Sequence, residues 1–484
     1  MLKKKNDIFN INTSNPRIGL VVSLLLSELV LILIYNINTL IFRFCLIIIS
    51  LIFLLIIYLI LDYFNVERSV IFIIITGTII RIFYLMHTSY LDRSYDVEGH
   101  LDYIKYLFNH NLNIPSVNEC WECYQPPLYY LFSTLFYALF NNSQISPIIV
   151  LQILSIFVSI VVIIVAYYLF KILFKKNLKL ILLSLSLFTF WSGNIIFSIR
   201  ITNDTFFYLF TSLSILYLLK WIINPDKNHV LYIAAIFATL DTISKANGII
   251  IWGVIGFLII IKLLKNKGNF KLIHKFIYLP TLFIVSILIT FYNPIFNPSN
   301  DWLIGNINTL NRALRVNNTL LNFIVLDTNT YFSQANVSSW LDSSGRQYFM
   351  NYLFKTSLFG EFIYSDNQKD LMIILSTLLL VIISIFIIGF FIYLIRARNI
   401  KEYNFFTLIF ISLFVSIVML RLKYAYSSDY DFRFILPILI PCIAFIGYLL
   451  NEFEKRKMNL LLLLGYIFNI LFITLNIIFI LRIS

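Results

Sequence analysis

Apolar runs long enough to cross a lipid bilayer recur along most of this chain. A helix needs roughly 20 apolar residues to span a hydrocarbon core about 30 Å thick. Runs of this kind lie near residues 18–35, 40–61, 69–87, 146–170, 178–197, 205–222, 276–292, 371–395, 405–422, 434–450 and 460–481. The run at 231–261 is too long for one ordinary span and is polar around 241–248, which predicts two short helices joined by a turn. The predicted fold class is therefore an all-α integral membrane protein, a polytopic bundle of about thirteen transmembrane helices.

Composition and charge placement support the same class. Charged residues make up 13% of the 484 residues, against roughly a quarter in soluble domains. The net charge of +13 would suggest a nucleic-acid partner in a soluble protein. Here the basic residues gather in short loops near residues 3–5, 171–179, 262–275, 396–401 and 455–457. The positive-inside rule places these loops and the N-terminus in the cytoplasm, so we expect a multi-pass plasma-membrane protein and no nucleic acid.

This orientation depends on one segment. Residues 126–140 must lie along the outer surface as an interfacial helix, because a crossing there would turn the later lysine-rich loops outward. The first apolar run then stays in the chain as a signal anchor. The predicted regions are an N-terminal segment with two extra helices (1–68), a catalytic module (69–292) with a first outer loop (88–145), a second outer loop (293–370) and C-terminal helices (371–484).

Ionisable residues collect at the predicted outer face. Asp96, Glu98 and His100 follow one another in the first outer loop. Further members of this set are Arg200 and Asp204 at a turn between spans, Lys245 in the polar break, and Arg433 before the span at 434–450. Charges at a membrane edge are costly, so a set of them on one side predicts a functional site.

The signs of these charges indicate group transfer. A carboxylate such as Asp96 or Glu98 can act as a general base, whereas lysine and arginine suit a lipid-linked phosphate. The candidate catalytic residues are Asp96 and Glu98, and the candidate donor-phosphate or substrate-binding residues are His100, Arg200, Asp204, Lys245 and Arg433. A transporter would need charges near the midplane of the membrane, whereas these lie toward one edge.

Four motifs in order resemble a known family. They are Asp96 to His100 followed by Pro-Pro-Leu-Tyr-Tyr at 126–130, Arg-Ile-Thr-Asn-Asp-Thr at 200–205, Ser-Lys-Ala-Asn-Gly at 244–248, and Arg-Phe-Ile-Leu-Pro at 433–437. This pattern is similar to the GT-C superfamily of membrane glycosyltransferases, and within it to the protein O-mannosyltransferase and lipid A aminoarabinose transferase branch, glycosyltransferase family 39. The resemblance runs from about residue 69 to residue 450.

The resemblance implies a polyprenyl-phosphate-linked sugar donor, an inverting transfer and Asp96 as the base that activates the acceptor. The sequence departs from the family at Val97. Members of this branch commonly have adjacent Asp and Glu, whereas Glu98 here is displaced by one residue, which puts its role in doubt.

Two cysteines lie in the first outer loop. Cys120 and Cys123 admit a disulfide in an oxidising compartment, a zinc site completed by His100 or His110, or free thiols, and we favour the disulfide. The neighbouring Tyr129 and Tyr130 are expected to be interfacial aromatics.

The sequence thus predicts an inverting glycosyltransferase that moves a sugar from a polyprenyl-phosphate carrier to a protein, lipid or polysaccharide outside the cytoplasm. No cofactor is expected, and no nucleotide-binding Rossmann fingerprint is present. The alternatives are a metal-dependent oligosaccharyltransferase with a lipid-diphosphate donor and a lipid-carrier transporter or flippase.

Overall fold

The computed structural model describes residues 40–94, 96–143, 145–265, 276–292, 295, 311–396 and 400–484. These residues are helical or irregular, and within them strand-like pairing is recorded as an isolated bridge between Arg315 and Tyr426. The apolar run at 18–35 lies outside the described residues. The all-α polytopic bundle expected from the sequence is confirmed over the rest.

The helices follow the apolar runs closely. The first half of the chain contains α2 (Leu40–Tyr63), α3 (Arg68–His87), α4 (Val97–Asn109), α5 (Leu128–Phe140), α6 (Pro147–Phe174), α7 (Leu178–Thr189), α8 (Ser192–Phe197), α9 (Asp204–Ile223), α10 (Asn228–Thr242), η1 (Ala246–Gly248), α11 (Ile249–Lys265) and α12 (Tyr278–Thr290). The second half contains η4 (Arg312–Leu314), α14 (Leu320–Ile324), α15 (Thr328–Ser333), η5 (Asp342–Ser344), α16 (Phe349–Phe359), η6 (Asp366–Gln368), α17 (Lys369–Arg396), α18 (Lys401–Lys423), η7 (Ser427–Tyr430), η8 (Phe432–Ile438), α19 (Leu439–Lys455) and α20 (Asn459–Ile483). Eight helical segments of the described chain are long and apolar enough to cross a membrane, and several shorter apolar helices accompany them.

One predicted span is interrupted. The run at 178–197 divides into α7 and α8 at Phe190 and Trp191, where a single helix was expected. Polar groups at the break find partners across the fold: the side-chain Nε1 of Trp191 donates to the Ser357 carbonyl at 2.7 Å, and the backbone N–H of Ser192 donates to Asn476 Oδ1 at 3.0 Å. Irregular backbone at membrane depth is tolerated only where such partners exist, and here they come from distant helices.

The predicted break at 241–248 is present. Helix α10 ends at Thr242, and α11 begins after the short η1 turn. A Cβ atom at Gly248 would lie 2.4 Å from the Thr242 backbone nitrogen, so the close approach of the two chain segments requires glycine. The break therefore leaves Lys245 in a tight, non-helical turn between two apolar helices.

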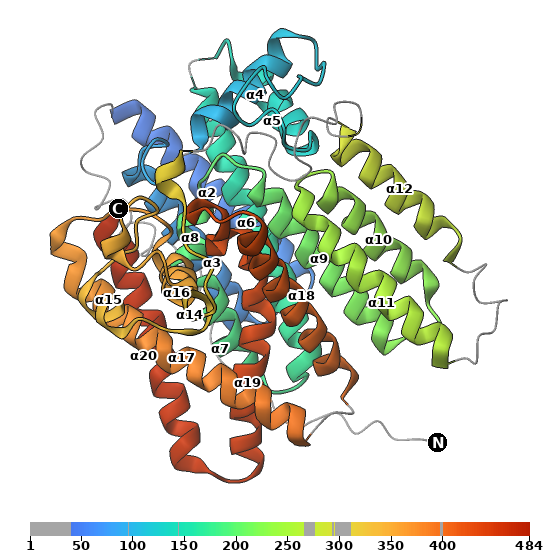
Figure 1. Ribbon diagram of the computed structural model, residues 1–484, viewed down its shortest axis with the longest axis vertical. Coiled ribbons are helices and arrows are strands. Elements are labelled where there is room, and N and C mark those ends of the chain that lie inside the picture. Colours follow the sequence, from blue (N-terminus) through green and yellow to red (C-terminus); the bar gives the residue numbers. More distant parts are fainter. Residues whose placement is uncertain are drawn as a thin grey trace.

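The first outer loop folds into two helices that pack against each other, α4 and α5, at the top of Figure 1. At 13 residues, α5 is shorter than the roughly 20 residues of a spanning helix. Tyr129 and Tyr130 are 1% and 0% exposed, so the expectation that they are interfacial aromatics was wrong. Their rings pack between α4, α5 and α9 instead, and the Tyr130 ring stacks on that of Tyr103 at 3.9 Å.

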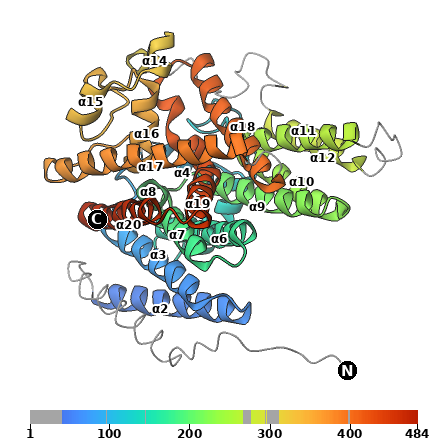
Figure 2. The ribbon, with the colours of Figure 1, turned by 90° about the horizontal axis from the view of Figure 1, so that it is seen from below.

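The second outer loop carries the short helices α14, α15 and α16. In Figure 2, α14 and α15 lie at one edge of the molecule and α2 at the opposite edge. Helix α16 packs against α8, α17 and η8. Arg421 of α18 is fully buried and donates at 2.8 Å to the carbonyls of Asn317 and Gln347, which ties this loop to the bundle.

Candidate active site

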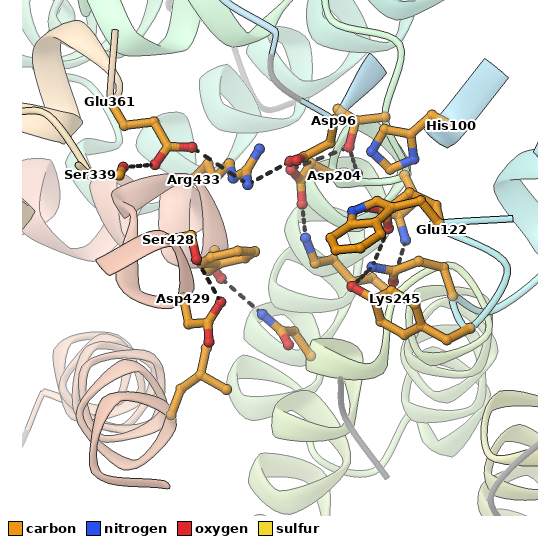
Figure 3. Close-up of a pocket in the computed structure, with 18 of the residues that line it drawn as sticks. Asp96, His100, Glu122, Asp204, Lys245, Ser339, Glu361, Ser428, Asp429 and Arg433 are labelled. Carbon is orange, nitrogen blue, oxygen red and sulfur yellow. Dashed lines mark hydrogen bonds and ion pairs between the residues drawn. The ribbon is translucent and has the colours of Figure 1, made fainter. Parts of the chain in front are cut away.

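A cavity of about 480 Å³ lies where the two outer loops meet the ends of the membrane helices. Its walls come from the start of α4, the turn at 121–125, the start of α9, the break at 245–247, the second outer loop and the η7–η8 segment. Figure 3 shows Arg433 between Asp96 on one side and Glu361 on the other. Segments far apart in the sequence thus place acidic and basic side chains around one cavity.

Asp96 lies at the N-terminal end of α4 and is held by two arginines. Arg433 Nη2 donates to Asp96 Oδ2 at 2.8 Å, and Arg200 Nη2 lies 4.0 Å from the same oxygen. Burial raises the pKa of Asp96, but the charges of Arg433 and Arg200 outweigh it and hold the pKa at about 2. The carboxylate is therefore ionised and firmly paired in this state.

Lys245 and Asp204 form a second ion pair in the cavity wall. Both side chains are almost completely buried. Asp204 is the first residue of α9, where the helix dipole favours a negative charge. Lys245 Nζ also lies 4.5 Å from the centre of the Phe434 ring, a cation–π contact. A buried lysine needs such partners to remain charged.

Arg433 is positioned by several elements at once. Its backbone N–H donates to Asp431 Oδ1 at 3.0 Å, and its carbonyl accepts from Tyr208 Oη at 2.9 Å. The Nη2 atom that donates to Asp96 also lies 3.9 Å from Glu361 Oε1. Glu361 itself accepts hydrogen bonds from Ser339 and from Tyr352. The second outer loop therefore helps to orient the arginine that faces Asp96.

His100 lines the cavity one helical turn after Asp96. Its Nδ1 lies 2.8 Å from the hydroxyl of buried Tyr130. Burial lowers the pKa of His100 to about 3, although Asp96 and Asp204 act in the opposite direction. The imidazole is therefore neutral at physiological pH and serves as a hydrogen-bonding group rather than a cation.

A second carboxyl group enters the cavity from the turn at 121–125. Glu122 is 4% exposed and accepts a hydrogen bond from Gln125 Nε2 at 3.1 Å. Asn203 Nδ2 in turn donates to Gln125 Oε1 and to the Ser244 carbonyl, each at 3.0 Å. Burial, with a further contribution from Asp96, raises the pKa of Glu122 to about 8. Glu122 is therefore mainly neutral at pH 7, in contrast to Asp96.

The structure places some of the predicted site residues around the cavity and leaves others outside it. Asp96, His100, Asp204, Lys245 and Arg433 all line the cavity. Arg200 lies behind Asp96, 3% exposed, and its three guanidinium nitrogens make no hydrogen bond within the described structure. Glu98 is exposed and is not part of the cavity wall, because the turn of α4 directs it away from the face that carries His100. Cys120 and Cys123 are joined by a disulfide beside Glu122.

Several cavity residues were missed from the sequence. Glu122, Gln125, Ser339 and Glu361 all line the cavity. The two cysteines that flank Trp121 and Glu122 were the available signal, since a disulfide fixes a turn at that point. The residues of the second outer loop carried no such signal. Among the residues that the structure describes, no group of three or more His, Cys, Asp or Glu side chains is arranged to hold a metal ion.

The fold and the cavity define a polytopic helical membrane protein with a buried, charged site built from two long loops and from helix ends. The family model for dolichyl-phosphate-mannose-protein mannosyltransferases matches residues 124–292. This segment contains the motifs at 126–130, 200–205 and 244–248, whereas Asp96 and Arg433 lie outside it. The match confirms the resemblance to GT-C membrane glycosyltransferases and supports glycosyltransferase activity. No curated protein matches the chain significantly.

Proposed function

We propose that the protein transfers a sugar from a polyprenyl-phosphate carrier to an acceptor with inversion at the anomeric carbon. The acceptor is a protein, lipid or polysaccharide on the extracytoplasmic side of the plasma membrane, and the N-terminus is cytoplasmic. The observation that carries this proposal is the contact of Asp96 with Arg433 in a cavity that also contains Lys245. The family match supports the donor class in general terms.

The cations suit the phosphate of such a donor. Arg433 and Lys245 line the cavity, and Arg200 adds a third positive charge behind Asp96. Each is buried, so a phosphate oxygen that reached them would meet little competition from water. Asp204 keeps Lys245 in place and charged before the donor arrives. His100 contributes a neutral hydrogen-bonding group toward the substrate.

Asp96 is the proposed general base, and its pairing with arginine implies an order of events. With Arg433 and Arg200 beside it, the carboxylate is too weak a base to accept a proton readily. A donor phosphate would compete with Asp96 for Arg433 and so raise the basicity of Asp96. Glu98, exposed on α4, has no part in this scheme.

The chemical step is then a single displacement. Asp96 takes the proton of the acceptor hydroxyl, and the acceptor oxygen attacks the anomeric carbon of the sugar. The bond between that carbon and the phosphate oxygen breaks, and polyprenyl phosphate leaves with its charge held by Lys245 and Arg433. One displacement at one carbon gives inversion.

The direct experiment is Asp96→Asn in the purified protein, with a panel of polyprenyl-phosphate sugars that begins with mannose. We expect transfer to fall by roughly 100-fold or more. Asp102→Asn is the matched control, because Asp102 is an exposed residue of the same helix. Transfer by Asp96→Asn at the wild-type rate would remove Asp96 as the base.

Two further measurements separate the alternatives. Loss of wild-type transfer in EDTA, with recovery on addition of a divalent ion, would favour a metal-dependent oligosaccharyltransferase. Movement of labelled carrier across liposomes without its consumption would favour a transporter.

Lys245→Ala should raise the apparent KM for the donor, and an unchanged KM would remove Lys245 from the phosphate site.

A further inference from the structure

The turn between Cys120 and Cys123 has a defined place in the cavity. The disulfide closes the turn, and the Cys123 backbone N–H donates to the Cys120 carbonyl at 3.2 Å. Both intervening residues, Trp121 and Glu122, line the cavity. The disulfide therefore fixes two side chains of a surface loop at a buried, charged site.

This turn also presses closely on α4. A Cβ atom built on Gly99 would lie 2.9 Å from Glu122 Cγ and 3.2 Å from both Cβ and Cδ1 of Trp121. Gly99 precedes His100 and follows Asp96 by three residues in the chain. The absence of a side chain at Gly99 thus lets the turn reach the same wall of the cavity as the proposed base.

The surroundings of Glu122 differ from those of Asp96. Asp96 accepts a hydrogen bond from Arg433 and lies 4.0 Å from Arg200, whereas the hydrogen bond that Glu122 accepts comes from the neutral amide of Gln125. The charged and titratable groups that act on Glu122 or feel its charge are Asp96, Arg433 and Lys245 from three other segments, and Tyr124 and Tyr130 nearby. Burial with one amide partner favours the neutral acid, which can donate a hydrogen bond as well as accept one.

Trp121 supplies a different surface. Its side chain lies at the mouth of the cavity, with the residue 44% exposed. A flat aromatic face next to a carboxyl group and two amides, those of Gln125 and Asn203, suits a ring with hydroxyls around its edge and C–H groups on its face. Pyranose and furanose sugars have this chemistry, and a phosphate does not.

We propose that the Glu122 carboxylic acid donates a hydrogen bond to a hydroxyl of the sugar being transferred, that Trp121 packs on the face of the same ring, and that the Cys120–Cys123 disulfide holds both residues for this contact. The proposal rests on the proposed function and names the part of the site that selects the sugar. The phosphate of the donor lies with the cations, on the side of Lys245 and Arg433.

The test compares Glu122→Gln, Glu122→Ala and Trp121→Ala with wild type, with the donor of the panel that wild type uses best. We expect Glu122→Ala and Trp121→Ala to lower kcat/KM by about 10- to 100-fold. Glu122→Gln keeps a hydrogen-bond donor and should stay within a few fold of wild type at pH 7. Glu119→Gln is the matched control, because Glu119 is an exposed residue next to the disulfide.

Two readouts separate sugar contact from a structural role. First, wild type and Glu122→Ala should use a donor that lacks the contacted hydroxyl at the same low rate. A donor that lacks a different hydroxyl should lower the rate of both proteins by the same factor, so the difference between wild type and Glu122→Ala should persist. Second, wild type should lose activity as the pH rises through about 8, where Glu122 ionises, and Glu122→Gln should lose less of it. The Cys120→Ser/Cys123→Ser double variant should behave like Glu122→Ala.

The outcomes are distinct. Wild-type rates from Glu122→Ala with every donor would overturn the sugar contact while the proposed function stands. Complete loss in Glu122→Gln at pH 7, with a folded protein, would make Glu122 a base and would also overturn the contact. Failure of wild type to transfer any sugar of the panel would count against the proposed function itself, and the sugar contact would fall with it.

Discussion

Arg433 donates a 2.8 Å hydrogen bond to Asp96, although the two residues are 337 positions apart in the chain. One comes from the short η8 helix before α19 and the other from the N-terminal end of α4. The pair joins the first outer loop to the C-terminal half of the bundle. A ligand that takes Arg433 away from Asp96 would therefore alter both the charge balance of the cavity and the contact between the two halves.

Arg433→Lys should lower transfer by roughly 100- to 1,000-fold, because the guanidinium faces Asp96 and Glu361 through Nη2 and Asp431 through Nε, and a single ammonium cannot face all three carboxylates. The measurement is kcat/KM with the polyprenyl-phosphate donor. Arg312→Lys, an exposed position in the second outer loop, is the control. Equal kcat/KM for wild type and Arg433→Lys would show that the guanidinium does not act on the donor.

The buried Lys245–Asp204 pair should be strongly coupled in stability. Lys245→Met or Asp204→Asn alone leaves one buried group without its partner and should cost about 3–5 kcal/mol in the free energy of unfolding. The double variant should cost less than the sum of the two. The measurement is unfolding of the purified protein in a mild detergent.

The matching control for these single and double variants is the Lys105–Asp102 pair on α4. These side chains are 49% and 59% exposed and lie 3.7 Å apart. Replacing either Lys105 or Asp102 in the same way should therefore change the unfolding free energy by less than about 1 kcal/mol. Additive effects of the Lys245 and Asp204 variants would mean that the two side chains do not stabilise each other.

Gly99→Ala should impair transfer without unfolding the protein. The added methyl would meet Glu122 and Trp121 at 2.9–3.2 Å and push the disulfide-closed turn away from α4, which should lower kcat/KM by roughly 10- to 100-fold. Gly253→Ala on α11 is the control, since nothing lies within 4 Å of its Cβ position. Full activity in Gly99→Ala would show that the position of the turn does not matter for catalysis.

The ionisation of Glu122 should make stability depend on pH. The pKa of Glu122 is raised from 4.5 to about 8 in the folded protein. The contribution of Glu122 to the free energy of unfolding is therefore complete below pH 4.5 and is lost as the pH rises through 8. Wild type should therefore lose on the order of a few kcal/mol between pH 5 and pH 8.5 that Glu122→Gln does not lose. Thermal unfolding across this range measures the difference, with Glu119→Gln as control. Parallel curves for wild type and Glu122→Gln would contradict this ionisation.

Local sequence accounts for most of the helices. A run of apolar residues long enough for the bilayer must satisfy its own backbone, and the helix is the way for a single segment to do so. The polar break around Lys245 was predictable for the same reason, since Asp241 and Lys245 interrupt the apolar run. The break at Trp191 was not predictable, because the groups that satisfy it, Ser357 and Asn476, come from distant segments.

The sequence by itself determined that the chain is a helical membrane protein and that charged residues collect at the ends of its spans, because both follow from the cost of placing polar groups in lipid. Only the tertiary structure decided which of those charges share a cavity. It placed Asp96 against Arg433, turned Glu98 away and brought in Glu122 and Glu361. The direction of a side chain on a short helix and the meeting of distant loops depend on packing among all the helices, which no local pattern records.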